Sequence, residues 1–173
     1  EVNKWLERIT KFSSEINYLL ADIQIKGTAK LDGFAGYDDG NKLYTRGDGN
    51  KGSDISRVFE RGLGVFNNSE RGQGPGEIVV KRSYFEKYLS NHFEYPRNFQ
   101  ASLIKEKELD KLAIDAISAK AALFVPFNQL PHWLGGIDEF RRQFLDVVSQ
   151  LEGGVDFDID GVVFEIVNPE LKK

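Results

Sequence analysis

Cysteine is absent from the 173 residues, which excludes a disulfide framework and a thiolate zinc site. Histidine is scarce as well: His92 and His132 lie far apart, without metal-ligand spacing, so we expect them to be surface or packing residues. No apolar run is long enough to span a bilayer, and no signal-peptide pattern opens the chain. We therefore expect no membrane partner.

An excess of positive charge is also lacking. Lys and Arg total 23 residues against 27 Asp and Glu, which gives a formal net charge of -4. This balance argues against a protein whose whole surface binds nucleic acid, but it leaves room for a local basic groove. The candidates for such a groove, with an ordinary solvated face as the alternative, are Lys81, Arg82, Lys105, Lys107 and Lys111.

The residues that are present are typical of one globular domain. Hydrophobic residues make up 40% of the chain, and its length is sufficient to bury a core. Strands and helices follow each other without a regular βαβ rhythm, so we expect an α+β fold in which helices flank antiparallel sheets. We interpret residues 1–21 as a helical segment that leads into one core of residues 22–173, Glu1 as the start of a fragment, and the protein as a monomer.

Hydrophobic spacing and turn residues predict the order of the elements. The expected elements are an amphipathic helix at 2–12, a hairpin within 28–49 that turns at Asp39-Gly40, a Ser53-capped helix to about residue 62, a surface loop at 67–76, a buried strand at 77–80, a Ser83-capped helix, a mainly helical stretch at 98–122, a strand at 122–127 stopped by Pro126, a helix at 137–152 and a strand pair within 157–168.

One lysine stands at the start of a short motif, KLDG, at residues 30–33. Taken alone, this motif is weak, and a solvated lysine at a strand end is the better explanation of Lys30. The alternative is a nucleophile. A lysine ammonium cannot attack phosphorus, so a nucleophilic lysine must be activated by burial or by a cationic neighbour.

Further polar, glycine-rich motifs follow KLDG and favour the second interpretation. TRGDG at 45–49 combines glycines, which let the backbone approach a ligand, with Arg46, which can bind a phosphate through two hydrogen bonds. GE at 76–77, PRN at 96–98 and DGVV at 160–163 come after it. This ordered set, over about residues 1–168, resembles the nucleotidyltransferase (adenylation) domain of NAD-dependent DNA ligases, in a divergent or truncated and possibly viral-type form.

The resemblance implies a ligase/nucleotidyltransferase (ATP-grasp-like) fold and a defined chemistry. Lys30 would attack the α-phosphate of NAD, release nicotinamide mononucleotide and keep AMP as a phosphoramidate, with Mg²⁺ spreading the developing charge. AMP would then pass to the 5′-phosphate of nicked double-stranded DNA for sealing. The implied partners are that DNA and the absent oligonucleotide-binding, zinc and helix-hairpin-helix modules, in a bacterial cytoplasm or the host cell of a virus.

The resemblance also implies roles for individual residues. Lys30 and Asp32 would be catalytic, with Asp32 orienting the lysine, while Glu77 would face the ribose or the metal. Either Phe124 or Phe127 would stack on adenine, although core packing is the simpler explanation of both side chains. The nucleotide-binding set comprises Thr28, Ala29, Leu31, Gly33, Arg46, Asp48, Glu77, Arg97, Phe127, Asp160, Gly161 and Glu165.

Two positions depart from the family pattern. Thr28 replaces a glutamate that recognises the adenine amino group, and a neutral hydroxyl is the weaker acceptor. Glu165 replaces a lysine that faces phosphate, so that an anion stands where a cation is usual. These departures leave two alternatives: an ATP-dependent polynucleotide ligase or other covalent nucleotidyltransferase, and a degenerate module that binds DNA or a partner without catalysis.

Overall fold

The N-terminal amphipathic helix is confirmed in the computed structural model, which describes residues 1–16, 18–45 and 52–171. Helix α1 spans Val2–Glu15 and buries Leu6 and Ile9 on its apolar face. A 3-10 turn at Leu20–Asp22 then leads into strand β1, Gln24–Leu31. The order of helix, turn and strand agrees with the change of apolar spacing in the sequence.

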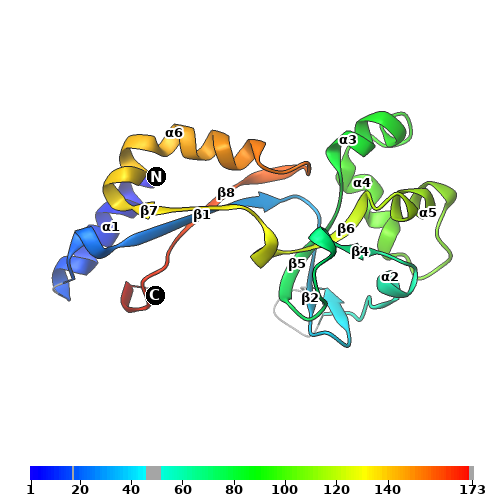
Figure 1. Cartoon of the computed structure of the whole chain (residues 1–173), viewed down its shortest axis with the longest axis horizontal. Coiled ribbons are helices and arrows are strands. Elements are labelled where there is room, and N and C mark those ends of the chain that lie inside the picture. The colour runs from blue at the N-terminus through cyan, green and yellow to red at the C-terminus, as the bar shows by residue number, and fades with distance from the viewer. Residues whose placement is uncertain (17, 46–51, 172–173) are drawn as a thin grey trace. The chain divides into compact units, whose positions relative to one another are not determined.

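The chain divides into two compact units. Residues 1–30, 131–154 and 161–173 form unit 1, and residues 31–130 and 155–160 form unit 2. Unit 1 contains a three-stranded sheet of order β7-β1-β8, in which β7 is His132–Gly136 and β8 is Ile159–Ile166 (Figure 1). The sequence suggests a different boundary, at residue 21, between a helical segment and one core. That boundary stays a prediction.

Helices cover one face of the unit 1 sheet. Helix α6, Ile137–Gly153, lies along β7 in Figure 1 and is capped by Gly154, as the glycine pair predicts. Its apolar face and that of α1 pack on the inward side chains of β1 and β8. The buried residues of this core are Leu6, Ile9, Ile23, Ile25, Ile137, Phe140, Ile166 and Leu171.

Unit 2 is built on a second sheet, of order β3-β2-β5-β6-β4. All of its neighbouring strands are antiparallel except β4 and β6, which are parallel. The confirmed hairpin turn at Asp39-Gly40 joins β2 to β3, with Gly40 at φ 96°, which glycine adopts without strain. The strands are β2 Phe34–Asp38, β3 Leu43–Thr45, β4 Gly64–Val65, β5 Gly74–Val80 and β6 Ala122–Pro126.

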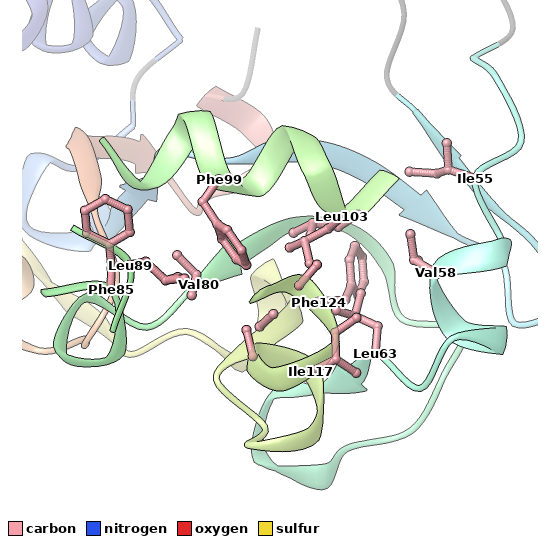
Figure 2. Close-up of a cluster of buried hydrophobic side chains, with 14 of the residues drawn as sticks. Ile55, Val58, Leu63, Val80, Phe85, Leu89, Phe99, Leu103, Ile117 and Phe124 are labelled. Carbon is pink, nitrogen blue, oxygen red and sulfur yellow. The ribbon is translucent and has the colours of Figure 1, made fainter. Parts of the chain in front are cut away.

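Short helices pack on this sheet and enclose the main core of unit 2. In Figure 2, Phe99 and Leu103 point from the helical chain toward Phe124 of β6, and all three are fully buried. The helical segments of unit 2 are α2 Arg57–Glu60, a 3-10 turn at Phe66–Asn68, α3 Arg82–Tyr84, a π-helical turn at Phe85–Leu89, α4 Pro96–Gln100, 3-10 turns at Ala101–Ile104 and Phe127–Gln129, and α5 Lys111–Ser118. Unit 1 contains a further 3-10 turn at Pro169–Leu171.

Both predicted serine caps are wrong. The Ser53 carbonyl accepts a hydrogen bond from the Thr45 N–H at 2.9 Å, so this backbone continues the hairpin and the helix begins only at Arg57. The Ser83 hydroxyl donates to the Asp156 carboxylate, while the residue that precedes α3 is Lys81. In both places the serine bonds to a distant segment, which local sequence does not reveal.

Other boundaries also differ from the predictions. Strand β5 begins at Gly74, inside the expected loop, because residues 74–76 pair with β2. The helical stretch at 98–122 is interrupted at 105–110, and the strand pair within 157–168 is a single strand, β8. Strand β7 was not predicted.

The α+β class with antiparallel sheets is confirmed. No helix in the described residues has the length and apolarity needed to cross a bilayer.

A buried ion pair fixes the tip of the hairpin in unit 2. Asp38 is 1% exposed, and its carboxylate accepts two hydrogen bonds from Arg71, at 2.7 and 2.9 Å. The backbone N–H groups of Gly40 and Gly72 also donate to it, at 3.0 and 3.1 Å. Burial alone would raise the pKa of Asp38, but these donors outweigh it, so the pKa is lowered.

Candidate active site

Strand β1 presents Thr28 and Lys30 on one face of the unit 1 sheet. Its residues alternate, with Ala29 and Leu31 buried on the opposite face, as expected for a half-buried strand. Lys30 is exposed and is the last residue of β1 within unit 1. The lysine thus lies on the face of the sheet that α1 and α6 leave uncovered.

Strand β8, the neighbour of β1, adds Glu165 to the same uncovered face. Phe164 and Ile166 pack into the unit 1 core, so the pleat turns Val163 and Glu165 to the other side, where both are exposed. On the other neighbour, β7, His132 lies directly opposite Thr28 and is exposed. The sequence did not link His132 to this face, because β7 itself was not predicted.

The turn after Lys30 belongs to unit 2 and is tightly held there. The Asp32 N–H donates to the Asp158 carbonyl at 3.0 Å, and the Asp32 carboxylate lies 3.8 Å from Arg97. A side chain at Gly33 would overlap the carbonyl oxygen of Ile78, so only glycine fits between this turn and β5. Two of the predicted site residues, Asp32 and Arg97, are therefore neighbours.

Gln100 also holds this turn, and sequence reasoning missed it. It is fully buried; its side-chain amide donates to the Asp32 carbonyl at 3.0 Å, and its oxygen accepts from the Val80 N–H at 2.9 Å. A glutamine inside an apolar helix face, next to Phe99, was the available signal, since a buried polar side chain needs partners.

We expect Gln100→Leu to lower the free energy of unfolding by about 2 kcal/mol, because the buried Val80 N–H would lose its acceptor. Urea titration measures this. Gln129→Leu is the matched control: among the described residues, the Gln129 side chain bonds to the side chain of Gln73 alone, so its replacement should change stability by less than about 0.5 kcal/mol. Equal effects of the two variants would contradict the role of Gln100.

Glu77 lies within β5, between β2 and β6, and is half-buried. The described residues contain no group of three His, Cys, Asp or Glu that could enclose a metal ion. Glu77 and, with it, the Mg²⁺ expectation stay predictions.

The PRN motif shows why its residues occur together. Pro96 opens α4, and the Asn98 side chain accepts from the Tyr95 N–H at 3.0 Å, so proline and asparagine start the helix. Arg97 between them is exposed. The motif therefore presents an arginine on a rigid helical turn, close to Asp32.

The remaining predicted residues lie in different settings. Phe124 is fully buried in the unit 2 core, while Phe127 is half-buried against a second cluster that contains Leu31. Asp160 is exposed, and Gly161 has φ 132°, a conformation that favours glycine. Arg46 and Asp48 lie outside the described residues, so their roles stay predictions.

Comparison with known proteins gives relatives along the whole chain. It is 62% identical over 172 residues to a protein named DNA ligase from Ruthia magnifica, and 64% over 172 residues to one from Vesicomyosocius okutanii. It is 47% identical over 173 residues to a DNA ligase from Shewanella baltica. These alignments cover 99–100% of the chain but only 27–28% of each relative. No protein-family model matches the chain.

Proposed function

We propose that this chain is the adenylation part of an NAD-dependent DNA ligase, with a nucleotidyltransferase (ATP-grasp-like) fold. The observation that carries the proposal is the position of Lys30, exposed on the uncovered face of β1 directly before the turn that Asp32 and Gly33 form. The similarity to DNA ligases, which extends along 99% of this chain, supports the proposal. The chain spans about 28% of such a relative, so sealing would need the rest of the protein.

The proposed reaction begins at the Lys30 amine. Its lone pair forms a P–N bond with the α-phosphorus of NAD, and the bond from that phosphorus to the bridging oxygen breaks. Nicotinamide mononucleotide leaves with the electron pair, and the lysine nitrogen loses a proton. The 5′-phosphate of a nick then displaces the lysine to take the AMP, and the 3′-hydroxyl attacks that phosphate and releases AMP.

The neighbouring side chains would position the nucleotide. Thr28, two residues before Lys30 on the same face, would accept one hydrogen bond from the base. Asp32 and Arg97, 3.8 Å apart, would orient the lysine and hold phosphate, respectively. Glu77 would bind the ribose or hold Mg²⁺, which would supply charge neutralisation at the phosphates.

Glu165 favours a second candidate, a module that binds DNA or a partner without catalysis. Its exposed carboxylate shares the uncovered face with Lys30, where it would repel nucleotide phosphates. An ATP-dependent enzyme would use the same lysine with another donor. Incubation with labelled NAD or ATP separates the three: AMP retained only from NAD supports our proposal, AMP only from ATP changes the donor, and no adduct from either favours the non-catalytic module.

The charge at position 165 has a testable effect on nucleotide affinity. Glu165→Lys is expected to tighten binding of NAD roughly threefold to tenfold, because a repulsive charge on the uncovered face becomes attractive. Calorimetric titration measures the affinity. Glu170→Lys, the same charge change at another exposed position in unit 1, should have little effect. Unchanged affinity in Glu165→Lys would show that no phosphate binds beside this residue.

A further inference from the structure

A concave site lies entirely within unit 2. It is a cavity of about 580 Å³ between the end of α5, the turn after β4 and the start of β6. Its charged lining consists of Arg61, Lys81 and Lys120, and none of the described residues that line it is acidic. Phe66, Ile117 and Leu123 add apolar side chains to the lining, here called the apolar floor. The volume is within the range of ligand sites, and the charge selects an anion.

The backbone around this cavity is strained. Asn67, Asn68 and Lys120 have φ of 61°, 50° and 57°, and they are the non-glycine residues with positive φ in the described part of the chain. All three line the cavity. Asparagine adopts this conformation more readily than lysine does, so Lys120 carries the larger strain. Strained residues of this kind cluster at ligand-binding and catalytic sites.

Lys120 stands at a position that usually belongs to glycine. Helix α5 ends at Ser118, and the N–H groups of Lys120 and Ala121 donate to the carbonyls of Ile117 and Ala116. This is a Schellman motif, in which the left-handed residue is normally glycine. A lysine here destabilises the helix end relative to glycine, yet it places an ammonium group at the cavity.

The lysines at the cavity also lack neutralising partners among the described residues, where neither the Lys81 nor the Lys120 ammonium forms an ion pair. Two other basic side chains of unit 2 are engaged: Lys105 pairs with Asp110 at 3.0 Å, and Arg61 donates to the backbone carbonyls of Leu103, Glu106 and Lys107. The positive charge at the cavity is therefore available to a ligand.

We propose that this cavity binds a phosphodiester group of the DNA backbone, with Lys81 and Lys120 contacting the phosphate and the apolar floor contacting the sugar. The choice of DNA as the source of the phosphate rests on the proposed ligase function, whereas the anion site rests on the cavity itself. Contacts of this kind hold DNA in place without reading its sequence.

Lys120→Gly tests the proposal because stability and binding should change in opposite directions. Relief of the left-handed strain is expected to raise the Tm by about 2 °C. Affinity for a nicked duplex, measured by fluorescence anisotropy at low salt, should fall roughly fivefold, and the slope of log K against log salt should decrease by about one. Lys81→Gln should weaken binding similarly, while Lys4→Gln, the same charge change on exposed α1, should not.

The probes distinguish the possible outcomes. In competition against the fluorescent nicked duplex, unlabelled duplex should displace the probe, whereas AMP and inorganic phosphate should not. This result, with weakened duplex binding in Lys81→Gln, supports a DNA phosphate site. Displacement of the probe by AMP or phosphate would overturn the DNA assignment. Unchanged DNA affinity in both variants, or no DNA binding by the unaltered chain, would overturn the proposal. Adenylation by NAD should persist in Lys120→Gly, so loss of DNA binding there is separable from failure of the proposed enzymatic function.

Discussion

Replacing Lys30 with alanine is expected to abolish transfer of AMP to the protein, by more than about 10⁴-fold, because the variant has no amine to form the P–N bond. Stability should change by less than about 0.5 kcal/mol, since the side chain is exposed and the buried face of β1 is unaltered. Radiolabelled NAD with Mg²⁺, followed by separation under denaturing conditions, measures the covalent label.

A matched control is available four residues earlier in the same strand. Lys26 alternates onto the same face of β1, so Lys26→Ala removes an equal charge from an equivalent strand position. This variant should keep most of the label. Labelling that persists in Lys30→Ala, or that disappears equally in both variants, would remove Lys30 from the chemistry.

The largest expected change in stability comes from Arg71→Ala. We expect the free energy of unfolding to fall by about 3 kcal/mol, because the Asp38 carboxylate would stay buried without its cation. The same change removes the guanidinium that lies 3.7 Å above the Phe59 ring. Lys105→Ala, which breaks the exposed pair with Asp110, should cost at most about 1 kcal/mol. Similar losses in the two variants would contradict this account.

The pH dependence of stability tests the same pair by another route. The pKa of Asp38 is lowered in the folded protein, so the pair contributes fully above the unfolded pKa of aspartate, about 4, and its contribution is lost as pH falls through the folded pKa. Stability of the unaltered protein and of Arg71→Ala should therefore converge in acid. A constant difference between them down to pH 2 would show that the carboxylate does not respond to Arg71.

Elements whose signal is local were predictable from the sequence. The apolar stripes gave α1 and α6, and Asp39-Gly40 gave the hairpin turn, because helix and turn formation depend on neighbouring residues. Ser53 and Ser83 were misassigned because their partners, Thr45 and Asp156, belong to other segments. Long-range pairing of this kind leaves no periodic pattern in the chain.

The candidate site likewise contains residues that the sequence predicts and residues that it does not. Its motifs can be recognised in the sequence, since KLDG and PRN are contiguous, and the structure places Asp32 and Arg97 within 3.8 Å of each other. Gln100 could not be assigned in advance, because its role depends on two backbone groups that are distant in sequence. The cavity at Lys120 was equally hidden, since a left-handed backbone at lysine has no sequence signal.

The central claim is that one amine takes up AMP from a dinucleotide. Mass spectrometry of the protein after incubation with NAD and Mg²⁺, followed by peptide mapping, tests it most directly. We predict a single adenylyl group, carried by the peptide that contains Lys30 and absent when NAD is omitted. An unmodified chain, or a group attached to any other residue, would contradict the account.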